Sequence, residues 1–564
     1  MSPVALQRRA WLQFLLYCNS LVAAVQYGEN HAPVEKDEDL VAANFPDTNE
    51  TLYSPAFANP ESVLPGFSNG TDGPTDDATL AKKQTDLFLR SIAGRNDWAH
   101  YKVADFTSEE GRAFPYVVLS KSGPSSRSAE QEQQQQPPKL RVWIQGGVHG
   151  NEPAGDQAVL ALLGKLDARR VWRERLLEKL DIALLPRYNP DGAAYFQRAL
   201  ASNLDPNREH TKLVRGMSRG HKRLLSSFAP HVTVDVHEFT GTRPTGKNGI
   251  YKHGMDALVA AGKNLNTHAD IRNISEGMFA RGVGERLVRK GFRWEPYFTI
   301  GEGGGGDSTG SGIVLDEAGS DAKSGRNNYA LAQSVAILCE VRGIRLADQH
   351  FQRRVATALS MVGAILDIAV ANYEEVYRTV EGAIEKFIHS NDPIILTDFP
   401  NPTQRNITFV DRTTGKLTQV PVTFLSTTPT TANQTRARPE AYLIPRTWSD
   451  LASRLRDSGV VVETLREGYR GPAEALTIAS ASVARGYYEG AVQVTVTTDS
   501  ARKEDLVLPP GSFRVSTRQK NAALAFVALE PENVDSYVRF NLLPVRVGDE
   551  YPIFRIPRGI KGEK

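Results

Sequence analysis

Short apolar runs alternate with amphipathic segments between about residues 80 and 385. The strand-like runs are "YVVLS", "LRVWIQ", "DIALLP", "VTVDV" and "VAILCE", and helical stretches such as "VWRERLLEKL" and "EGMFARGVGERLVRK" lie between them. A long helical region follows at about 347–389, with a break expected near Asn372. Strands that alternate with helices predict an α/β domain with a mixed, mostly parallel sheet flanked by helices on both faces.

The pattern changes near residue 390. "VQVTVTT", "GSFRVSTR" and "YPIFRIP" alternate between apolar and polar positions and are bounded by Gly and Pro, with one helical segment, "RTWSDLASRLRDSG", among them. Alternation with a period of two is typical of half-buried strands. Since 564 residues exceed what one hydrophobic core usually supports, we expect an α/β domain over 80–389 and a smaller β-rich domain over 390–564.

The first 79 residues resemble neither domain. Arg8 and Arg9 precede an apolar run that ends in small residues, which is typical of a signal peptide over 1–24 with cleavage after Ala24. A cytosolic N-terminal helix is the alternative. Residues 25–79 are rich in Asn, Pro, Asp, Gly and Ser, so we expect a disordered leader or a pro-segment. The low-complexity stretch at 125–139 predicts an exposed loop.

Five Asn-X-Ser/Thr sequences support export to the cell exterior, namely those at Asn49, Asn69, Asn273, Asn406 and Asn433. Each is weak evidence alone. Of the two cysteines, Cys18 would leave with the signal peptide, and Cys339 alone cannot form an intramolecular disulfide. We therefore expect a secreted, N-glycosylated protein.

Composition excludes some partners. Hydrophobic residues make up 40% of the chain and charged residues 23%, and the formal net charge is +2. This balance gives no support for nucleic-acid binding. Beyond the N-terminus no segment reaches the 18 to 20 apolar residues that span a bilayer, so we expect no stable membrane insertion.

Candidate metal ligands occur where a strand opens into a helix. In "GGVHGNEPAGD", His149 and Glu152 follow the strand "LRVWIQ", and ligands bind at this edge of open α/β sheets. Catalytic zinc takes three protein ligands from His, Asp and Glu and leaves one position for water. His237 ends the strand "VTVDVHEF" and could be the third. His221, His231 and His253 compete on composition alone, and a His-X-X-Glu pair by itself is more often a salt bridge or helix cap.

Three further elements add substrate-binding and acid–base chemistry. "NPDG" is followed by Arg198 and then by Asn207 and Arg208 within "DPNR". Arginine gives carboxylates a bidentate grip and can stabilise an oxyanion beside a metal. Glu340 ends the apolar strand "VAILCE", where a buried carboxylate is costly unless it is paired or functional. The alternatives are surface arginines and an ion pair between Glu340 and Arg342.

The order of these motifs resembles the zinc carboxypeptidase family, the carboxypeptidase A-like metallopeptidases, over roughly residues 80–385. The resemblance implies one Zn²⁺ per chain and a metallocarboxypeptidase that hydrolyses C-terminal peptide bonds, with peptide or protein C-termini as substrates. It implies these roles: zinc ligands His149, Glu152 and His237; oxyanion stabilisation by Arg198; binding of the substrate carboxylate by Asn207 and Arg208; and a general base, Glu340.

Two departures from the family pattern leave alternatives open. Asn151 stands where pancreatic-type members have Arg, and "HGNE" also resembles related deacylases such as aspartoacylase. The mobile tyrosine of the family has no clear counterpart; Tyr329 lies much closer to Glu340 than expected. The Gly-rich stretch 301–312 predicts a flap near the cleft. The alternative functions are a zinc-dependent deacylase of N-acyl amino acids and a catalytically silent secreted binding protein.

Overall fold

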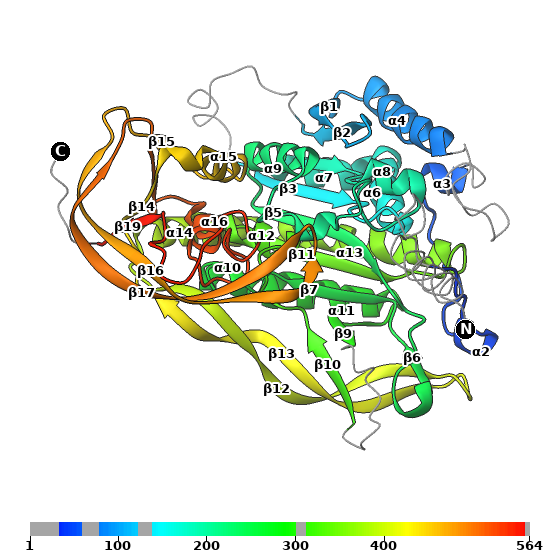
Figure 1. The fold of residues 1–564 in the computed structure, drawn as a ribbon. Helices are drawn as coiled ribbons and strands as arrows, with labels where there is room; N and C mark the ends of the chain where they lie inside the picture. Colours follow the sequence, from blue (N-terminus) through cyan, green and yellow to red (C-terminus); the bar gives the residue numbers. More distant parts are fainter. Residues whose placement is uncertain (1–32, 59–77, 122–137, 301–311, 559–564) are drawn as a thin grey trace, which may run out of the picture.

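The computed structural model describes residues 33–58, 78–121, 138–300 and 312–558 (Figure 1). The predicted signal peptide, most of the low-complexity stretch, most of the Gly-rich stretch and Asn69 lie outside the described residues. A mixed sheet of eight strands forms the centre of the fold, in the order β1-β2-β4-β3-β5-β11-β7-β8. These strands are β1 (Ala99–Thr107), β2 (Ala113–Leu119), β3 (Leu140–Gly146), β4 (Leu180–Leu185), β5 (Val232–Phe239), β7 (Ala257–Ala261), β8 (Trp294–Pro296) and β11 (Val335–Arg342).

The middle of this sheet is parallel. β4, β3, β5 and β11 pair in parallel, whereas β1, β2 and the β11–β7 pair are antiparallel. All eight residues of β5 and of β11 are buried, as expected for strands covered on both faces. The predicted α/β class with a mixed, mostly parallel sheet is confirmed, and all five strand-like runs form strands of this sheet.

Helices cover both faces of the sheet. One face packs against a core of Leu, Val and Ala side chains from the helices α6 (Pro153–Ala168), α7 (Arg170–Lys179), α11 (Arg281–Arg289), α13 (Phe351–Ala371) and α14 (Tyr373–His389). The other packs against α9 (Gly216–Phe228) and α12 (Gly325–Leu331). The long helical region breaks at Asn372, as predicted.

The expectation that no segment beyond the N-terminus is long and apolar enough to cross a membrane was wrong for one helix: within the described part of the chain, α13 has that length and composition. Its most apolar window is 83% buried inside the protein, against α6 and β11. The apolarity of α13 therefore reflects its place in the core.

Two more sheets lie beside the central one. A five-stranded sheet has the order β6-β12-β13-β10-β9, and a six-stranded sheet has the order β15-β18-β14-β19-β16-β17. Their strands are β6 (Tyr251–His253), β9 (Phe298–Ile300), β10 (Ile313–Glu317), β12 (Ile394–Asp411), β13 (Leu417–Arg436), β14 (Ala441–Ile444), β15 (Glu463–Thr464), β16 (Tyr469–Tyr488), β17 (Ala491–Leu508), β18 (Phe513–Ser516) and β19 (Phe554–Ile556). The C-terminal region is β-rich, as expected.

The C-terminal region and the α/β region share a sheet. β12 pairs with β6, and β13 pairs with β10, so strands from both sides of residue 390 belong to the five-stranded sheet. The six-stranded sheet packs around α15 (Ser449–Asp457) and α16 (Ala522–Leu529). All eight residues of α16 are buried. The division into domains at residue 390 stays a prediction.

Part of the segment expected to be disordered is ordered. Residues 33–58 contain the short helices α2 (Asp39–Ala42) and α3 (Pro55–Ala58), and Val41 and Phe45 are buried. Asp37 forms a two-contact ion pair with Arg342 at the end of β11, and both side chains are almost completely buried. The polar composition of this segment predicted disorder. The prediction failed because composition does not reveal that Asp37 has a buried partner 305 residues away.

Candidate active site

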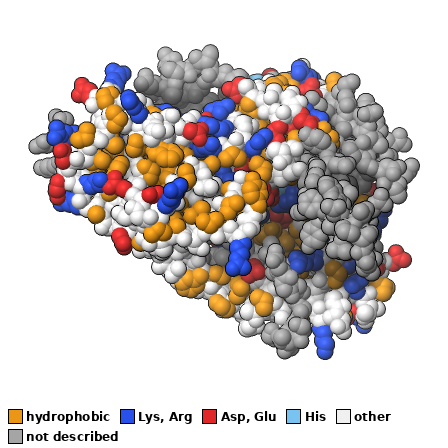
Figure 2. Space-filling view, in the orientation of Figure 1, with side chains coloured by type: hydrophobic (Ala, Val, Ile, Leu, Met, Phe, Trp, Pro, Cys, Tyr) orange, Lys and Arg blue, Asp and Glu red, His pale blue; other side chains and the backbone are white. Residues whose placement is uncertain are grey.

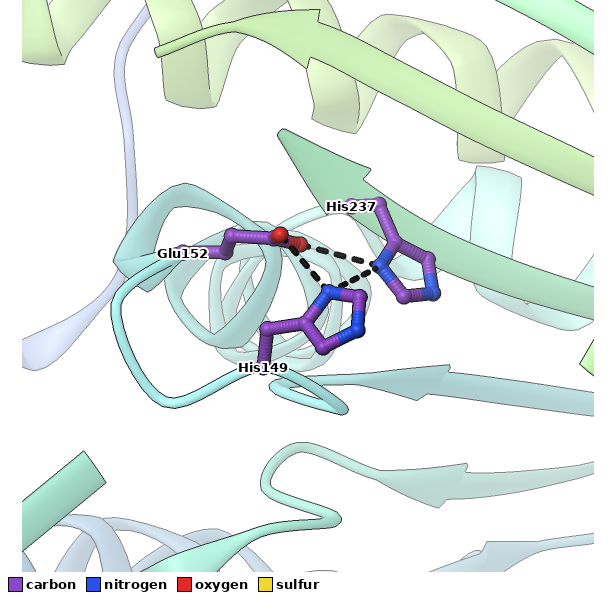
Figure 3. A group of neighbouring side chains, drawn as sticks. All are labelled: His149, Glu152 and His237. Carbon is purple, nitrogen blue, oxygen red and sulfur yellow. Dashed lines mark hydrogen bonds and ion pairs between the residues drawn. The ribbon is translucent and has the colours of Figure 1, made fainter. Parts of the chain in front are cut away.

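Three predicted ligand atoms converge at the carboxyl edge of the central sheet. His149 lies on the turn after β3, Glu152 is the N-cap residue just before α6, and His237 is the sixth residue of β5 (Figure 3). Nδ1 of His149 lies 2.7 Å from Oε1 of Glu152, and Nδ1 of His237 lies 3.1 Å from Nδ1 of His149 and 2.9 Å from Oε2 of Glu152. All three side chains are buried, and their ligand atoms lie within 4.8 Å of one another.

The turn that carries His149 depends on a close backbone approach. A Cβ atom at Gly150 would lie 1.9 Å from the carbonyl carbon of Gly192, so a side chain there would push the two loops apart. Gly192 belongs to "NPDG", in which Asn189 caps α8 (Pro190–Tyr195) by accepting from the Gly192 N–H at 2.8 Å. The glycines of both motifs thus let the metal-ligand turn and the Arg198 loop meet.

Carboxylates behind both histidines suit a metal ion. Oδ1 of Asp205 lies 3.1 Å from Nε2 of His149, and Oδ2 of Asp235 lies 3.2 Å from Nε2 of His237. The hydrogen bond between Nε2 of His149 and Asp205 fixes the tautomer of His149 and leaves Nδ1 as the ligand. The contact between Asp235 and His237 is an ion pair without hydrogen-bond geometry. Two Nδ1 lone pairs and one carboxylate facing a common point form the His/His/Glu set of catalytic zinc sites. The residues present therefore fit one zinc ion.

The surroundings of Glu152 favour its ionised form. Burial alone would raise the pKa of Glu152, but the adjacent His149 and His237 hold it below its ordinary value. The backbone N–H of Glu238 also donates to Oε2 of Glu152 at 3.0 Å. Glu152 is thus ionised at neutral pH, as a metal ligand must be.

Glu340 faces the same space from the neighbouring strand. It pairs with His237 in the parallel register of β5 and β11, and its side chain lines the cavity in front of the metal ligands. Within the described residues, Oε2 of Glu340 is buried without a hydrogen-bond partner, and burial raises the pKa of this carboxyl to about 8. A nearby cation would lower that pKa again. The alternative ion pair with Arg342 is not formed, because Arg342 binds Asp37.

Arg198 reaches the metal ligands from the loop after α8. Its Nη1 atom lies 3.2 Å from Nδ1 of His149 and 3.4 Å from Oε1 of Glu152. Nε and Nη2 donate to Oδ2 of Asp205 at 3.1 and 2.9 Å. Asp205 thus holds Arg198 with one oxygen and contacts His149 with the other, so it couples the guanidinium to the metal site.

Asn207 and Arg208 lie in a single 3₁₀ turn, η2 (Pro206–Arg208), and both line the cavity. Asp205 caps this turn by accepting from the Asn207 N–H at 2.7 Å. The Asn207 side chain accepts from the Gly325 N–H at 2.7 Å, and Arg208 Nη1 donates to the Asn207 carbonyl at 2.9 Å. As far as the described residues go, the Asn207 side-chain NH₂ group and most of the Arg208 donors remain available to a ligand.

These groups surround one large cavity of about 630 Å³. Six of the seven predicted site residues line it, and the seventh, His237, completes the metal cluster behind it. Figure 2 shows acidic and basic side chains gathered in a hollow of this face of the molecule. A polar cavity of this size can hold the end of a peptide chain.

The C-terminal region contributes the tip of a long hairpin to the rim of this cavity. β16 and β17 turn at Glu489 and Gly490, and Tyr488 lines the cavity (Figure 1). The Glu489 carboxylate accepts from the Asp205 N–H at 2.7 Å, and its carbonyl accepts from Lys212. The hairpin therefore contacts the residue that supports both His149 and Arg198.

The competing histidines lie outside the metal cluster. His221 contacts Gln145, His231 accepts from the Arg141 N–H at the start of β3, and His253 stacks on Phe298. Tyr329 is also excluded from the cavity wall: its buried hydroxyl accepts from Gln145 at 2.9 Å. Asn151 is buried and does not line the cavity.

Sequence reasoning missed several cavity residues. Tyr297 follows β8, Tyr488 lies at the hairpin tip, and Arg326 lies in the first turn of α12. A Tyr-Tyr-Glu-Gly turn between two alternating segments predicts a hairpin, but nothing local predicts where its tip docks. Tyr297 lies just before the segment 300–330 and Arg326 lies within it, and no sequence motif assigned a substrate-binding role to this segment.

Comparison with known proteins places the chain among peptidases. Residues 90–230 match the zinc carboxypeptidase family. Carboxypeptidase 2 of Trichophyton rubrum is 49% identical over 536 residues, which are 95% of this chain and 96% of that protein. A probable carboxypeptidase 2 of Arthroderma benhamiae is 48% identical over 530 residues, covering 94% and 96% of the two chains.

A solved metallo-carboxypeptidase from Pseudomonas aeruginosa, in complex with (2-guanidinoethylmercapto)succinic acid, is 15% identical, with a TM-score of 0.36 and coverage of 52% of this chain and 69% of that one. The fungal relatives match almost the whole chain, C-terminal region included, and bear the names of carboxypeptidases, not of deacylases. The chain belongs to the zinc carboxypeptidase family and is a zinc metallocarboxypeptidase.

Proposed function

We propose that this protein is a secreted enzyme that removes the C-terminal residue of peptides and that Glu340 is its general base. The observation that carries the proposal is the position of Glu340. Its carboxylate, unpartnered within the described chain, lines the same cavity as His149 and Glu152, one strand away from His237. A water molecule between Glu340 and the three ligands would contact both the base and the metal.

Zinc, when bound to His149, Glu152 and His237, supplies Lewis acidity that polarises the scissile carbonyl and lowers the pKa of water. The protein supplies the proton transfers. Glu340 accepts a proton from the attacking water and returns it to the leaving amine nitrogen. Its burial favours this exchange, because a buried carboxylate gains more from taking up a proton than an exposed one does.

Arg198 and Arg208 have different roles toward the substrate. Arg198 lies beside His149 and Glu152, where oxyanion charge would develop, and Asp205 fixes its orientation. Arg208 and Asn207 lie together in η2 and bind the terminal carboxylate. A guanidinium gives a carboxylate two parallel, charge-assisted hydrogen bonds. Binding the chain end there places the preceding peptide bond toward the metal ligands.

Export is supported by the sequence and by the surface. The N-terminal 24 residues have the features of a signal peptide. The four acceptor residues within the described part of the chain, Asn49, Asn273, Asn406 and Asn433, are all exposed. Exposed acceptors suit N-glycosylation in the secretory pathway.

The test compares peptides that differ only at the C-terminus. The zinc-loaded enzyme should trim a peptide with a free carboxylate and leave the same peptide with a C-terminal amide intact, since the amide offers no negative oxygen to Arg208. Arg208→Ala should reduce kcat/KM for the free acid about tenfold to a hundredfold. Arg378→Ala, on the exposed surface of α14, is the matched control. Equal cleavage of acid and amide by the wild type would refute the proposal.

A further inference from the structure

Arg326 is a buried cation in the cavity wall that has no carboxylate partner within the described chain. The residue is 7% exposed and lines the cavity together with Arg208 and Glu340. Nη2 of Arg326 donates to the Gly319 carbonyl at 2.6 Å, and Nε is buried without a hydrogen-bond partner. Among the residues that the structure describes, no carboxylate oxygen lies within ion-pair distance of the guanidinium, and burial lowers its pKa. An unpaired buried charge of this kind is costly to folding.

The acidic side chains nearest to Arg326 are bound by other residues. Lys263 forms ion pairs with both Glu276 and Glu317, the latter at 3.0 Å. Glu317 also accepts hydrogen bonds from the backbone N–H of Thr427 at 2.7 Å and from neighbouring hydroxyls. Asp321 is paired with Lys323 at 2.8 Å. These contacts engage the carboxylates, and none of them forms an ion pair with the guanidinium of Arg326, although their negative charges still act on it.

Arg326 lies close to the residues that we assign to the C-terminal end of a bound peptide. Gly325, the preceding residue, donates its N–H to the side chain of Asn207. Arg326 therefore directly follows a residue that contacts Asn207, one of the two residues that we assign to the substrate's terminal carboxylate. The side chain of a terminal residue branches from the carbon that bears this carboxylate, so it must enter the adjacent part of the cavity.

Apolar side chains also line the cavity, beside the charged ones. Leu338 and Ala318 line it, and Tyr297 packs against both of them. The charges of both Arg326 and Arg208 act on the phenol of Tyr297, so this ring lies near both guanidinium groups. A side chain with one or two methylenes and a terminal anion would place its methylenes against Leu338 and its charge against Arg326.

We propose that Arg326 forms the side-chain subsite of this enzyme and selects peptides that end in glutamate or aspartate. The inference rests on the proposed function, because it takes the terminal carboxylate to bind at Asn207 and Arg208. An acidic side chain supplies the missing partner of the guanidinium. A basic side chain would meet the like charge of Arg326, and a neutral one would leave the guanidinium without an ion-pair partner.

The first experiment measures kcat/KM of the zinc-loaded enzyme for N-blocked dipeptides that differ only in the last residue. The glutamate and glutamine peptides are nearly isosteric, so their ratio isolates the charge. We expect glutamate to exceed glutamine by about 10- to 100-fold, the range for hydrogen bonds to charged groups, and lysine to be the poorest substrate. Equal rates for glutamate and glutamine would overturn the inference and leave the proposed function standing. Failure to cleave any free-acid peptide would refute both.

The second experiment removes the cation. Arg326→Gln should bring the glutamate-to-glutamine ratio close to one, because kcat/KM for the glutamate peptide should fall. Arg272→Gln, at another largely buried arginine whose Nε donates to the Thr267 carbonyl, should keep the wild-type ratio. A ratio unchanged in Arg326→Gln would overturn the proposal. Should this variant fail to fold, product inhibition of the wild type decides the question: free L-glutamate should inhibit about tenfold more strongly than L-glutamine, and equal inhibition contradicts the proposal.

Discussion

His237 and Glu340 are register partners on the neighbouring parallel strands β5 and β11. Partners in a parallel sheet present their side chains on the same face, so the third metal ligand and the proposed base are fixed by the same backbone pairing. Both strands are buried along their whole length. The relative position of the base and the third ligand is thus set by the pairing of two strands in the buried core.

The first prediction concerns metal content. The purified mature protein should hold about one zinc ion per chain, since three ligands of the catalytic type converge. His237→Ala should lose zinc and activity together. Elemental analysis after dialysis measures the loss. His231→Gln serves as the control, because His231 is buried at the start of the same strand and contacts Arg141 and Glu381 instead. Full zinc occupancy in His237→Ala would show that another residue is the ligand.

The second prediction separates metal binding from proton transfer. Glu340→Gln keeps the shape of the side chain but removes its basicity, so zinc content should remain at the wild-type level. kcat should fall about a hundredfold to ten-thousandfold, the usual contribution of a general base. Two other cavity carboxylates, Glu238 and Glu317, are bound by Arg354 and Lys263, so neither should take over the role. A near-normal kcat in Glu340→Gln would rule out the assigned role.

The third prediction concerns the hairpin tip. Tyr488 lines the cavity, and the positive charges of Arg208 and Lys323 act on its phenol, although burial is the main cause of its raised pKa. Tyr488→Phe should therefore lower kcat/KM for free-acid peptides about tenfold by removing a hydrogen bond to the bound carboxylate. Tyr487→Phe is the matched control, because that side chain is 76% exposed. Identical kinetics of the two variants would exclude contact between Tyr488 and the substrate.

The fourth prediction concerns the N-terminal segment. Asp37→Ala leaves Arg342 buried without its partner, and breaking a buried ion pair in this way typically costs about 3 to 5 kcal/mol of the free energy of unfolding. Denaturant unfolding measures the loss. Asp39→Ala, at an exposed position of α2, should change stability by less than about 0.5 kcal/mol. Since none of residues 33–58 lines the cavity, kcat/KM of Asp37→Ala should match the wild type wherever the variant is folded.

The fifth prediction concerns acid stability. Burial lowers the pKa of His253 from 6.5 to about 3, with Arg342 and Arg243 adding to the effect. The unfolded chain takes up a proton as the pH falls below about 6.5, whereas the folded protein does not until about pH 3. Stability is therefore lost across that window, at up to about 1.4 kcal/mol per pH unit.

His253→Phe removes this titration and keeps an aromatic ring against Phe298. As the pH falls from 6.5 toward 4, the unfolding free energy of the wild type should decrease relative to that of this variant. His389→Phe, at an exposed position of α14, controls for the change of residue type. A difference that stays constant with pH would contradict the prediction.

Features that depend on local sequence patterns could be predicted, whereas contacts between residues far apart in the chain could not. His237 and Glu340 could be placed because each lies at or near the end of an apolar strand, and His149 and Glu152 because they follow one, at the edge of the sheet where ligands bind. The roles of these four residues were implied by the order of the motifs. The ion pair of Asp37 and the docking of Glu489 on Asp205 join residues about 300 positions apart. No local periodicity encodes such pairs. Helix α16 was missed because it is apolar on all sides and carries no amphipathic signal.

The docking of Glu489 on Asp205 has a consequence for biosynthesis. Because translation proceeds from the N-terminus, the α/β region with the candidate metal ligands and Glu340 is synthesised before the hairpin of residues 469–508. Until that hairpin folds, Asp205 lacks its contact with Glu489, and the rim of the cavity lacks Tyr488. The nascent chain therefore carries an incomplete cleft through most of its synthesis, and full peptidase activity is expected only when the last fifth of the polypeptide has emerged.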